Sequence, residues 1–171
     1  TSVYAQNDGS WVDETSPSAA ESETGKILLA AEQLTAEAGG VVLRLSALYG
    51  NGRLALRDRL LNGTARLPAD GRRMLNQIHH QDAVSAIGFL LNRNDAGGEV
   101  FNVSDDDPAS YHEIFAWLCE KYDRPMPPSA AEESPQKRGL TNKRVCNKKL
   151  RALGWRPLFP SFREGYAAAQ K

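Results

Sequence analysis

The chain has 171 residues, of which 41% are hydrophobic and 25% charged, and its formal net charge is zero. This length suits one domain, or one lobe of a larger fold, with a substantial core. No apolar stretch approaches the ~20 residues that a membrane helix needs, and the zero net charge argues against nucleic acid as the main partner. The two cysteines, Cys119 and Cys146, show neither metal-ligand spacing nor a disulfide framework, which favours a reducing, cytoplasmic location.

The charges are unevenly distributed along the chain. Residues 1–37 are mostly acidic, whereas the segment after Gln136 is basic. The simplest interpretation of both segments is a solvated surface. The alternatives are a phosphate-bearing ligand, or contact with another part of the same protein. The basic segment lacks the interleaved aromatic residues that are typical of a single-strand binder.

The first regular elements that we expect follow a polar loop. Apolar residues at helical spacing predict a helix over about 21–38, and Gly39-Gly40 ends it where glycine can adopt a left-handed conformation. Residues 41–45 are rich in branched side chains and read as a buried parallel strand. With the apolar opening segment as a strand, the order is strand, helix, strand, which is the unit of a doubly wound sheet.

Further helices are predicted from periodicity and from capping patterns. We expect a short helix over 54–61, an amphipathic helix around 83–91 and a short strand over 100–103. Two Ser-x-x-Glu patterns predict capping boxes at the start of later helices, the first at Ser110 and the second at Ser161.

The region between these capping boxes carries two more signals. Four prolines make residues 123–139 a loop or linker. Asn147 is a suitable N-cap for another short helix, which Gly154 would end.

Four segments resemble the extended short-chain dehydrogenases/reductases, the family of NAD-dependent epimerases and dehydratases. Thr1–Ala5 is similar to a strand end at the family's active site, and Arg44–Gly50 (Arg-Leu-Ser-Ala-Leu-Tyr-Gly) to a second strand end. Asn76–Ala83 resembles the family's Ile-His-x-x-Asp segment, and Gly98–Val103 its Gly-x-x-Phe-Asn-Val strand. The closing residues 147–166 are similar to a subgroup of uncharacterised epimerase-like proteins.

The resemblance implies a fold and a cofactor. We expect an α/β chain that corresponds to the C-terminal part of a Rossmann-type doubly wound parallel sheet, plus a small α+β substrate lobe. Residues 1–105 would supply the later strands and helices of the dinucleotide-binding fold, with interleaved substrate-lobe segments, and residues 106–171 mainly the substrate lobe. NAD or NADP would be the cofactor, with a missing N-terminal half of the same fold as partner.

The phosphate-binding part of such a site is not found in the sequence. The family's glycine-rich turn brings backbone N–H groups to a pyrophosphate at a helix N-terminus. Here Gly50-Asn51-Gly52 is a lone pair of glycines, with Ala55 where a third would fall, so it reads as a turn. We therefore expect this chain alone to bind a dinucleotide poorly.

The family's catalytic Tyr-x-x-x-Lys pair also lacks a match. Aligning Ala31-Glu32-Gln33 with the family's Ala-Glu-Gln places Thr24 at the tyrosine position and Leu28 at the lysine position. Threonine cannot ionise at useful pH, and leucine cannot hold the nicotinamide ribose. Thr24 is therefore the one candidate for a catalytic position, and Leu28 is a candidate for facing the cofactor.

The resemblance also assigns binding positions. Leu45, Ser46 and Leu48 would lie near the nicotinamide ring, and Arg53 and Asn76 near the substrate. Nucleotide-sugar epimerases often hold a diphosphate with an arginine where this chain has Leu75, which makes a nucleotide sugar a less suitable substrate.

Metal-binding interpretations are weaker than structural ones. Adjacent His79 and His80 on an extended segment point to opposite faces, so they make poor co-ligands, and His79 is better explained as a hydrogen-bonding structural residue. Asp105-Asp106-Asp107 lacks the glycine and glutamate of a calcium loop and fits a loop ahead of a helix. We predict no metal site.

Three functions remain open on the sequence. The chain could be part of an NAD(P)-dependent epimerase, dehydratase or reductase that acts on a small polar, sugar-like metabolite. It could instead belong to a binding protein of the same fold that senses a dinucleotide or metabolite without turnover. Third, it could be a fragment without autonomous activity. The expected partners are the missing half, a small-molecule substrate and a second copy in a homodimer, with no nucleic acid and no membrane.

Overall fold

The structure is a computed structural model, and it describes residues 2–19, 23–68, 71–130 and 142–169. Its elements, in chain order, are β1 (Trp11–Val12), α1 (Glu23–Glu37), β2 (Val42–Leu45), β3 (Ala47–Tyr49), α2 (Ala55–Leu61), β4 (Met74–Leu75), β5 (Gln77–His79), α3 (His80–Leu91), β6 (Val100–Val103), β7 (Ala109–Ser110), α4 (Tyr111–Tyr122), β8 (Arg144–Val145), α5 (Lys148–Ala152) and α6 (Phe162–Ala168). The predicted α/β class is confirmed.

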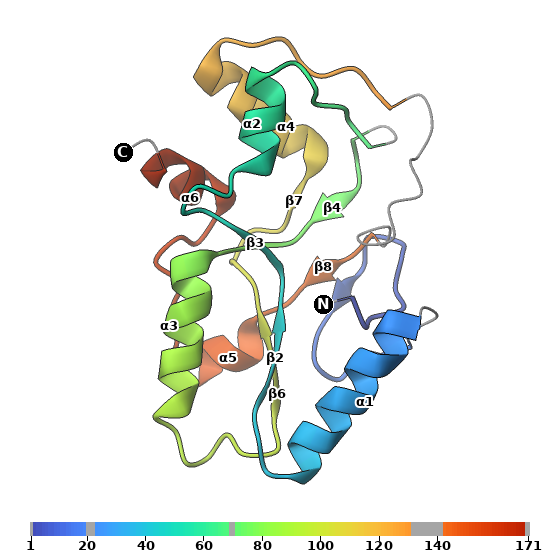
Figure 1. Ribbon diagram of the computed structural model, residues 1–171, viewed down its shortest axis with the longest axis vertical. Helices are drawn as coiled ribbons and strands as arrows, with labels where there is room; N and C mark the ends of the chain where they lie inside the picture. Colours follow the sequence, from blue (N-terminus) through green and yellow to red (C-terminus); the bar gives the residue numbers. More distant parts are fainter. Residues whose placement is uncertain (1, 20–22, 69–70, 131–141, 170–171) are drawn as a thin grey trace.

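The parallel pair of β2 and β6 forms the centre of the larger part of the molecule. It aligns Val42 with Val100 and Leu45 with Val103. Figure 1 shows this pair with α1 on one side and α3 and α5 on the other. Parallel strands with helices on both faces are the arrangement of doubly wound α/β folds. The side with α3 and α5 holds a buried core, which consists of Ile78, Ala83, Ala86, Leu90, Ala96, Phe101, Val103, Leu150 and Trp155.

Helix α1 agrees with the predicted helix, whose first residues 21–22 lie outside the described part of the chain. Gly39 follows it with φ +76°, the left-handed conformation that the Gly-Gly pair predicted. Gly25 is the one buried residue of the helix, so most of α1 faces away from the β2–β6 pair.

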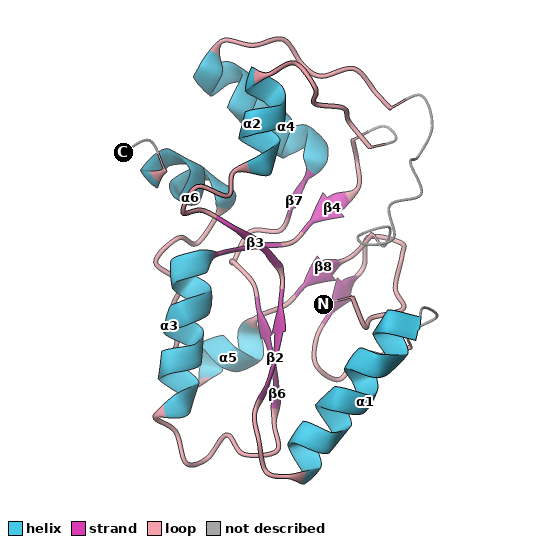
Figure 2. Cartoon of the chain, in the orientation of Figure 1, coloured by secondary structure: helices cyan, strands magenta, loops and turns pink. Residues whose placement is uncertain are grey.

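A smaller lobe contains α2, α4 and α6 together with the antiparallel pair of β4 and β7 (Figure 2). The buried apolar residues of this lobe pack against one another in one core. They are Tyr49, Leu54, Leu60, Ala65, Leu67, Ala109, Ile114, Phe115, Leu118, Phe162 and Tyr166. Both predicted capping boxes are present, at Ser110 with Glu113 before α4 and at Ser161 with Glu164 before α6. These reciprocal bonds satisfy N–H groups that a helix start otherwise leaves without partners.

Two more parallel pairs connect the parts of the molecule. Strand β3 pairs with β5 and aligns Ala47 with Gln77. Strand β1 pairs with β8, which comes more than a hundred residues later and aligns Arg144 with Trp11. Figure 1 shows β8 close to the amino terminus, so the carboxy-terminal segment returns to the start of the chain.

One local prediction is wrong, and another is confirmed only in part. Thr1 lies outside the described residues, and residues 2–5 form a turn with a single bridge from Tyr4 to Ser18 instead of a strand. Asn147 does precede α5, but its side chain makes no capping bond. Its Nδ2 donates instead to acceptors of the 104–106 segment, which holds the side chain against that loop.

The domain boundary between residues 105 and 106 stays a prediction. Helix α5 follows this boundary in the sequence, and it packs against β6 in the larger part of the molecule. Of the predicted loop over 123–139, residues 131–139 lie outside the described part of the chain. No helix among the described residues is long and apolar enough to cross a membrane.

Candidate functional site

The candidate site is the place where the chain changes strand partner. Ser46 N–H donates to the Val103 carbonyl at 3.0 Å, the last bond between β2 and β6. The next residue, Ala47, donates instead to the Asn76 carbonyl at 3.0 Å and begins the β3–β5 pair. The chain thus leaves one parallel partner and joins another at the carboxyl end of β2. In open α/β sheets ligands bind outside the carboxyl ends of the parallel strands, which makes the residues at this end of β2 the candidates for a site.

The three strand residues predicted to face the nicotinamide lie at this junction. Ser46 is buried at 4% exposure, and its Oγ has no hydrogen-bond partner among the described residues. Leu45 is partly buried, and Leu48 on β3 is 37% exposed. A buried serine hydroxyl usually has a partner, so this oxygen can accept or donate a bond to a further group.

Thr24 and Leu28 lie in the first turns of α1, and both are exposed. Figure 1 shows that this end of α1 lies toward the carboxyl end of β2. Lys26 is also exposed and forms an ion pair with Glu23 at 2.7 Å. The helix therefore presents neither a phenol nor an amine at the two family positions. The roles predicted for Thr24 and Leu28 stay predictions.

Arg53 lies at the start of the smaller lobe, in a tight turn. Gly50, Asn51 and Gly52 all have positive φ, and Gly50 and Arg53 exchange backbone bonds of 3.1 and 2.9 Å. A Cβ on Gly50 would lie 2.2 Å from His79 Nε2, so glycine is required there by space as well as by conformation. The glycine pair thus forms a turn, as the sequence predicts, and Arg53 is left exposed.

Asn76 holds the carboxy-terminal segment at the junction. Its Nδ2 donates to the Lys143 carbonyl at 2.9 Å, and its Oδ1 accepts from Val145 N–H at 2.7 Å. Both ends of the amide are therefore engaged by the backbone around β8. This contact positions β8, and the predicted substrate contact of Asn76 stays a prediction.

His79 has a structural environment, as the sequence favours. Its ring packs against Phe159, with ring centres 4.0 Å apart, and its Nδ1 accepts from Gln81 N–H at the start of α3. Burial, and then the charge of neighbouring His80, lower the pKa of His79 to about 4. The ring is therefore neutral at physiological pH.

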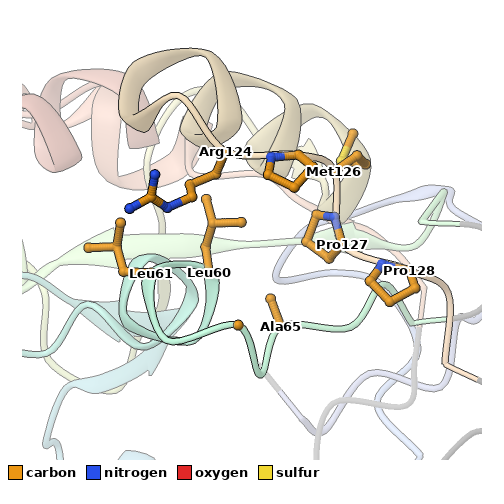
Figure 3. Close-up of a pocket in the computed structure, with 9 residues that line it drawn as sticks. Leu60, Leu61, Ala65, Arg124, Met126, Pro127 and Pro128 are labelled. Atoms are coloured by element: carbon orange, nitrogen blue, oxygen red, sulfur yellow. The ribbon is translucent and has the colours of Figure 1, made fainter.

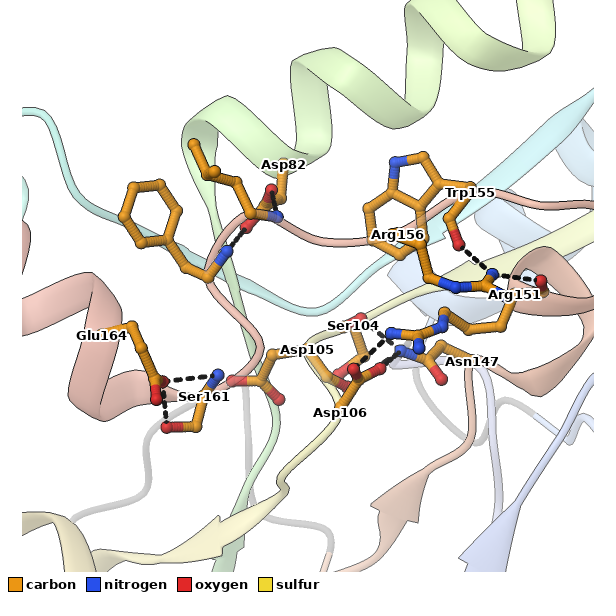
Figure 4. Close-up of polar contacts among 12 residues, drawn as sticks. Asp82, Ser104, Asp105, Asp106, Asn147, Arg151, Trp155, Arg156, Ser161 and Glu164 are labelled. Atoms are coloured by element: carbon orange, nitrogen blue, oxygen red, sulfur yellow. Dashed lines mark hydrogen bonds and ion pairs between the residues drawn. The ribbon is translucent and has the colours of Figure 1, made fainter.

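Hydrogen bonds and an ion pair join the carboxy-terminal segment to acidic residues that lie after β6 and at the start of α3 (Figure 4). Both oxygens of Asp82 accept backbone N–H groups, from Leu158 at 2.6 Å and from Phe159 at 3.0 Å. Asp106 accepts from Asn147 at 2.8 Å and pairs with Arg151. Burial raises the pKa of Asp82, and the two N–H groups oppose that rise.

Three buried polar residues near the junction were not predicted as site residues. They are Gln77, Asp105 and Lys143, each less than 5% exposed. Asp105 N–H donates to the Gln77 carbonyl at 2.8 Å, and one side-chain oxygen of each residue has no partner among the described residues. Burial, and then the neighbouring charge of Asp107, raise the pKa of Asp105 well above its ordinary value. The sequence shows only a loop and a basic segment at these positions, since burial depends on distant strands.

An apolar groove lies in the smaller lobe, between α2 and the proline-rich segment after α4 (Figure 3). Leu60, Leu61 and Met126 line it together with prolines 125, 127 and 128. None of the predicted site residues lines this groove. In the described residues, no three His, Cys, Asp or Glu side chains gather as a metal site would require.

Comparison with known proteins places this architecture. No protein-family model matches the chain. A curated protein, the 3-diazoavenalumate denitrifying reductase of a Streptomyces species, is 32% identical over 145 residues, covering 77% of this chain and 47% of that protein. A conserved protein of unknown function from Silicibacter pomeroyi is 32% identical, with a TM-score of 0.85 over 99% of this chain and 62% of that one.

A further solved structure carries a family description. A protein from Methylobacillus flagellatus, described as an NAD-dependent epimerase/dehydratase, is 29% identical, with a TM-score of 0.80 over 99% of this chain and 60% of that one. The chain is built like the NAD-dependent epimerase/dehydratase proteins. The resemblance to extended short-chain dehydrogenases/reductases is thereby confirmed.

The chain spans about half the length of the curated relative and about three fifths of the solved relatives. Solved structures that contain NAD with UDP-glucose or UDP-glucuronic acid, among them a UDP-glucuronic acid 4-epimerase from Bacillus cereus, are 21–23% identical, so this likeness concerns the fold alone.

Proposed function

We propose that the chain is part of an NAD(P)-dependent reductase-like protein of the epimerase/dehydratase fold, which acts on a small polar metabolite. The 32% identity to a reductase carries this proposal. The position of the predicted residues at the carboxyl end of β2 supports it, because parallel α/β folds bind ligands outside the carboxyl ends of their strands. In this proposal Leu45, Ser46 and Leu48 line the nicotinamide side of the site, and Arg53 and Asn76 the substrate side.

A reductase is favoured over a sugar-nucleotide epimerase for two reasons. The sugar-nucleotide enzymes are more distant in sequence than the reductase is. Leu75 also occupies the position where the resemblance implies a diphosphate-holding arginine, and it packs against the core of the smaller lobe. A leucine cannot neutralise a diphosphate, so the substrate that we propose is a small polar molecule without one.

The cofactor would be NAD or NADP, whose nicotinamide would deliver hydride to the substrate when bound. Residues of this chain would orient the ring and exclude water at the junction. Thr24 and Leu28 would not supply the acid or the ribose contact of the usual dyad, because neither side chain can ionise. A proton would therefore have to come from the substrate's surroundings or from solvent.

The second candidate is a non-catalytic protein that senses NAD(P) or a metabolite. The exposed Thr24 and Leu28 favour it, because they leave the two family positions without ionisable groups. Under this alternative, ligand binding would persist while turnover is zero.

We further propose that the remaining part of the family fold covers two apolar stripes, one on each side of the β2–β6 pair. On α3 the stripe consists of Val84, Ile87 and Leu91, which are 65%, 43% and 80% exposed. On α1 it contains Ile27 and Leu34, each 68% exposed. Large contiguous apolar surface of this kind marks an interaction site. A second copy of the chain is the alternative occupant, and a cytoplasmic location stays a prediction.

The test uses this chain and a version that includes about one domain of coding sequence upstream of Thr1. NADPH and NADH oxidation is followed by absorbance with 3-diazoavenalumate, the substrate named for the curated relative, and with a panel of small polar carbonyl compounds. The proposal expects oxidation by the extended protein only. Cofactor binding by the extended protein without oxidation of any panel member would favour the sensor, and no cofactor binding in either form would contradict both.

A double variant, Thr24→Tyr with Leu28→Lys, then examines the two family positions. If the protein already turns over substrate without the dyad, adding the tyrosine and the lysine should change the rate little. If the protein is a sensor, the same two residues should give it NADH or NADPH oxidation activity. The matched control changes Lys26 to Met, which removes the exposed amine between the two positions.

A further inference from the structure

The apolar groove of the smaller lobe opens directly onto the core of that lobe (Figure 3). Of its lining residues, Leu60 and Ala65 belong to the core and are 5% and 3% exposed, so they form the floor. Leu61 and Met126 line the same groove, yet they are 43% and 38% exposed. The groove therefore presents apolar surface to solvent beside a core that is otherwise covered.

Backbone hydrogen bonds hold both walls of the groove in place. On the proline side, Leu67 N–H donates to the Pro128 carbonyl at 3.0 Å. On the α2 side, Ala65 N–H donates to the Arg59 carbonyl at 2.9 Å. The three prolines of the wall restrict it further, because each ring fixes the backbone angle φ. A ligand thus meets a preformed groove, which lowers the conformational cost of binding.

Arg124 places a positive charge at the rim of this groove. Figure 3 shows its side chain extending toward Leu60 and Leu61. Its Nη1 donates to the Asp123 carbonyl at 3.1 Å, and no carboxylate of the described residues lies within ion-pair distance of the guanidinium. Arg66 donates to the carbonyl groups of two lining residues. The described lining residues include no acidic side chain, so the local charge favours an anion.

The size of the groove limits the ligand to a small molecule. Its volume is about 240 Å³, below the range of pockets that hold drug-sized molecules. A partner protein or a second copy would need more surface, because stable interfaces bury about 800 Å² on each side. Two large apolar side chains, those of Leu61 and Met126, are the exposed ones among the described lining residues.

The remaining part of the family fold is also a less suitable occupant. The apolar stripes that we assign to it lie on α1 and α3, beside the β2–β6 pair. Figure 1 shows α2 and α4, which flank the groove, at the other end of the molecule from α1.

We propose that this groove binds a small carboxylate whose apolar body has about the size of one ring. The apolar body packs on Leu60, Leu61 and Met126, and the carboxylate accepts hydrogen bonds from Arg124. Arginine suits a carboxylate because its planar guanidinium donates parallel N–H groups. The flexible methionine side chain adapts to irregular apolar shapes and makes favourable contacts with rings. The groove is separate from the strand junction, so this inference goes beyond the proposed function and does not rest on it.

The experiment titrates three probes separately into the ¹⁵N-labelled chain at neutral pH and constant ionic strength. Sodium benzoate has both the ring and the charge, benzyl alcohol has the ring alone, and sodium acetate has the charge alone. The readout is the shift of the backbone amides of Leu61, Gly63 and Met126, which all belong to residues that line the groove.

Two variants change the groove, and two serve as matched controls. Arg124→Gln removes the charge at the rim, and Leu61→Gln removes apolar surface; both side chains are exposed, so the fold is retained. Arg59→Gln removes an exposed arginine of α2 that does not line the groove. Leu158→Gln removes a leucine that is 69% exposed elsewhere on the surface.

We expect saturable benzoate shifts at these amides in the wild type and in both controls. Acetate and benzyl alcohol should each bind at least about fivefold more weakly, because each lacks one half of the recognition. Arg124→Gln should weaken benzoate binding about fivefold and leave benzyl alcohol unchanged. Leu61→Gln should weaken the binding of both.

Several results would overturn the proposal. Benzoate shifts that do not saturate, or that centre on the junction amides of Ser46 and Asn76, would place the ligand elsewhere. Equal benzoate affinity in Arg124→Gln, or benzyl alcohol bound as tightly as benzoate, would exclude a carboxylate as the ligand class. Groove amides that shift with protein concentration in the absence of any probe would show self-association there and contradict a small-molecule site.

Discussion

The smaller lobe and the β2–β6 region differ in how completely each buries its apolar residues. The smaller lobe closes its own core around Ile114, Phe115 and Tyr166, all at most 1% exposed. The β2–β6 region has a core on the α3 side, yet α1 and α3 leave large apolar side chains exposed on their outer faces. The comparison teaches that the apolar residues of the smaller lobe are covered within this chain, whereas several on the outer faces of α1 and α3 are left exposed.

The largest effect that we expect comes from the closed core. Phe115→Ala removes a ring that is 1% exposed and should lower the free energy of unfolding by about 3–5 kcal/mol. Urea unfolding followed by circular dichroism measures this loss. A loss below ~1 kcal/mol would mean that the smaller lobe is loosely packed, and the comparison would fail.

Two helical glycines sharpen the comparison. A Cβ on Gly165 would lie 1.9 Å from the Tyr49 hydroxyl, whereas a Cβ on Gly88 of α3 would meet nothing within 4 Å. Gly165→Ala should therefore destabilise the protein by about 1–3 kcal/mol through overpacking. Gly88→Ala should stabilise it by up to ~1 kcal/mol, because alanine favours helix more than glycine does. Equal effects of the two changes would contradict the different packing of the two regions.

Two carboxylates lie at the boundary between the regions, and replacing each by an amide should change the free energy of unfolding in opposite directions. Asp82 accepts two backbone N–H groups, so Asp82→Asn loses an acceptor and should destabilise the protein by about 1–3 kcal/mol. One oxygen of Asp105 has no partner among the described residues, and burial raises the pKa of Asp105 in the folded state, so Asp105→Asn should stabilise the protein at neutral pH.

The sign follows from linkage. A folded-state pKa above the ordinary value means that the folded protein binds more protons than the unfolded chain. Stability therefore falls as pH rises above 3.8, the ordinary pKa of an aspartate. The gain from Asp105→Asn should accordingly shrink as pH falls toward that value. Unfolding midpoints of both variants measured across acidic and neutral pH test this, and a pH-independent gain would exclude the linkage.

The smallest effect on stability should come from the stripe on α3. Changing Val84, Ile87 and Leu91 to serine should alter the free energy of unfolding of this chain by less than ~0.5 kcal/mol per site, since the side chains are exposed. The same changes should weaken association with a separately produced upstream segment in sedimentation experiments. Unchanged association would exclude this stripe as a contact, and loss of self-association would identify a homodimer instead.

Much of the helical architecture could be predicted from local sequence. The spacing of apolar residues located α1 and α3, and the Ser-x-x-Glu patterns located the starts of α4 and α6. These features depend on residues three or four positions apart, which a single sequence shows directly. The pairs β1–β8 and β4–β7 were not predicted, because each strand has two residues and its partner lies far along the chain.

The candidate site was less predictable, for a physical reason. The family resemblance placed Ser46 and Asn76, and the structure brings both to one strand junction. Asp105 and Lys143 were interpreted as parts of a loop and of a solvated basic segment. Their burial follows from strands that pack over them, and nothing in the neighbouring residues signals it.

The central proposal is that this chain contains ligand-binding residues of an NAD(P)-binding fold. The phosphate-binding part of that fold would lie in another segment. The most direct test of this proposal is a fluorescence titration of NADH and NADPH with this chain and with the version extended upstream of Thr1. We predict enhanced nicotinamide fluorescence with the extended protein and none with the chain alone. Tight binding of either dinucleotide by the chain alone would contradict the account.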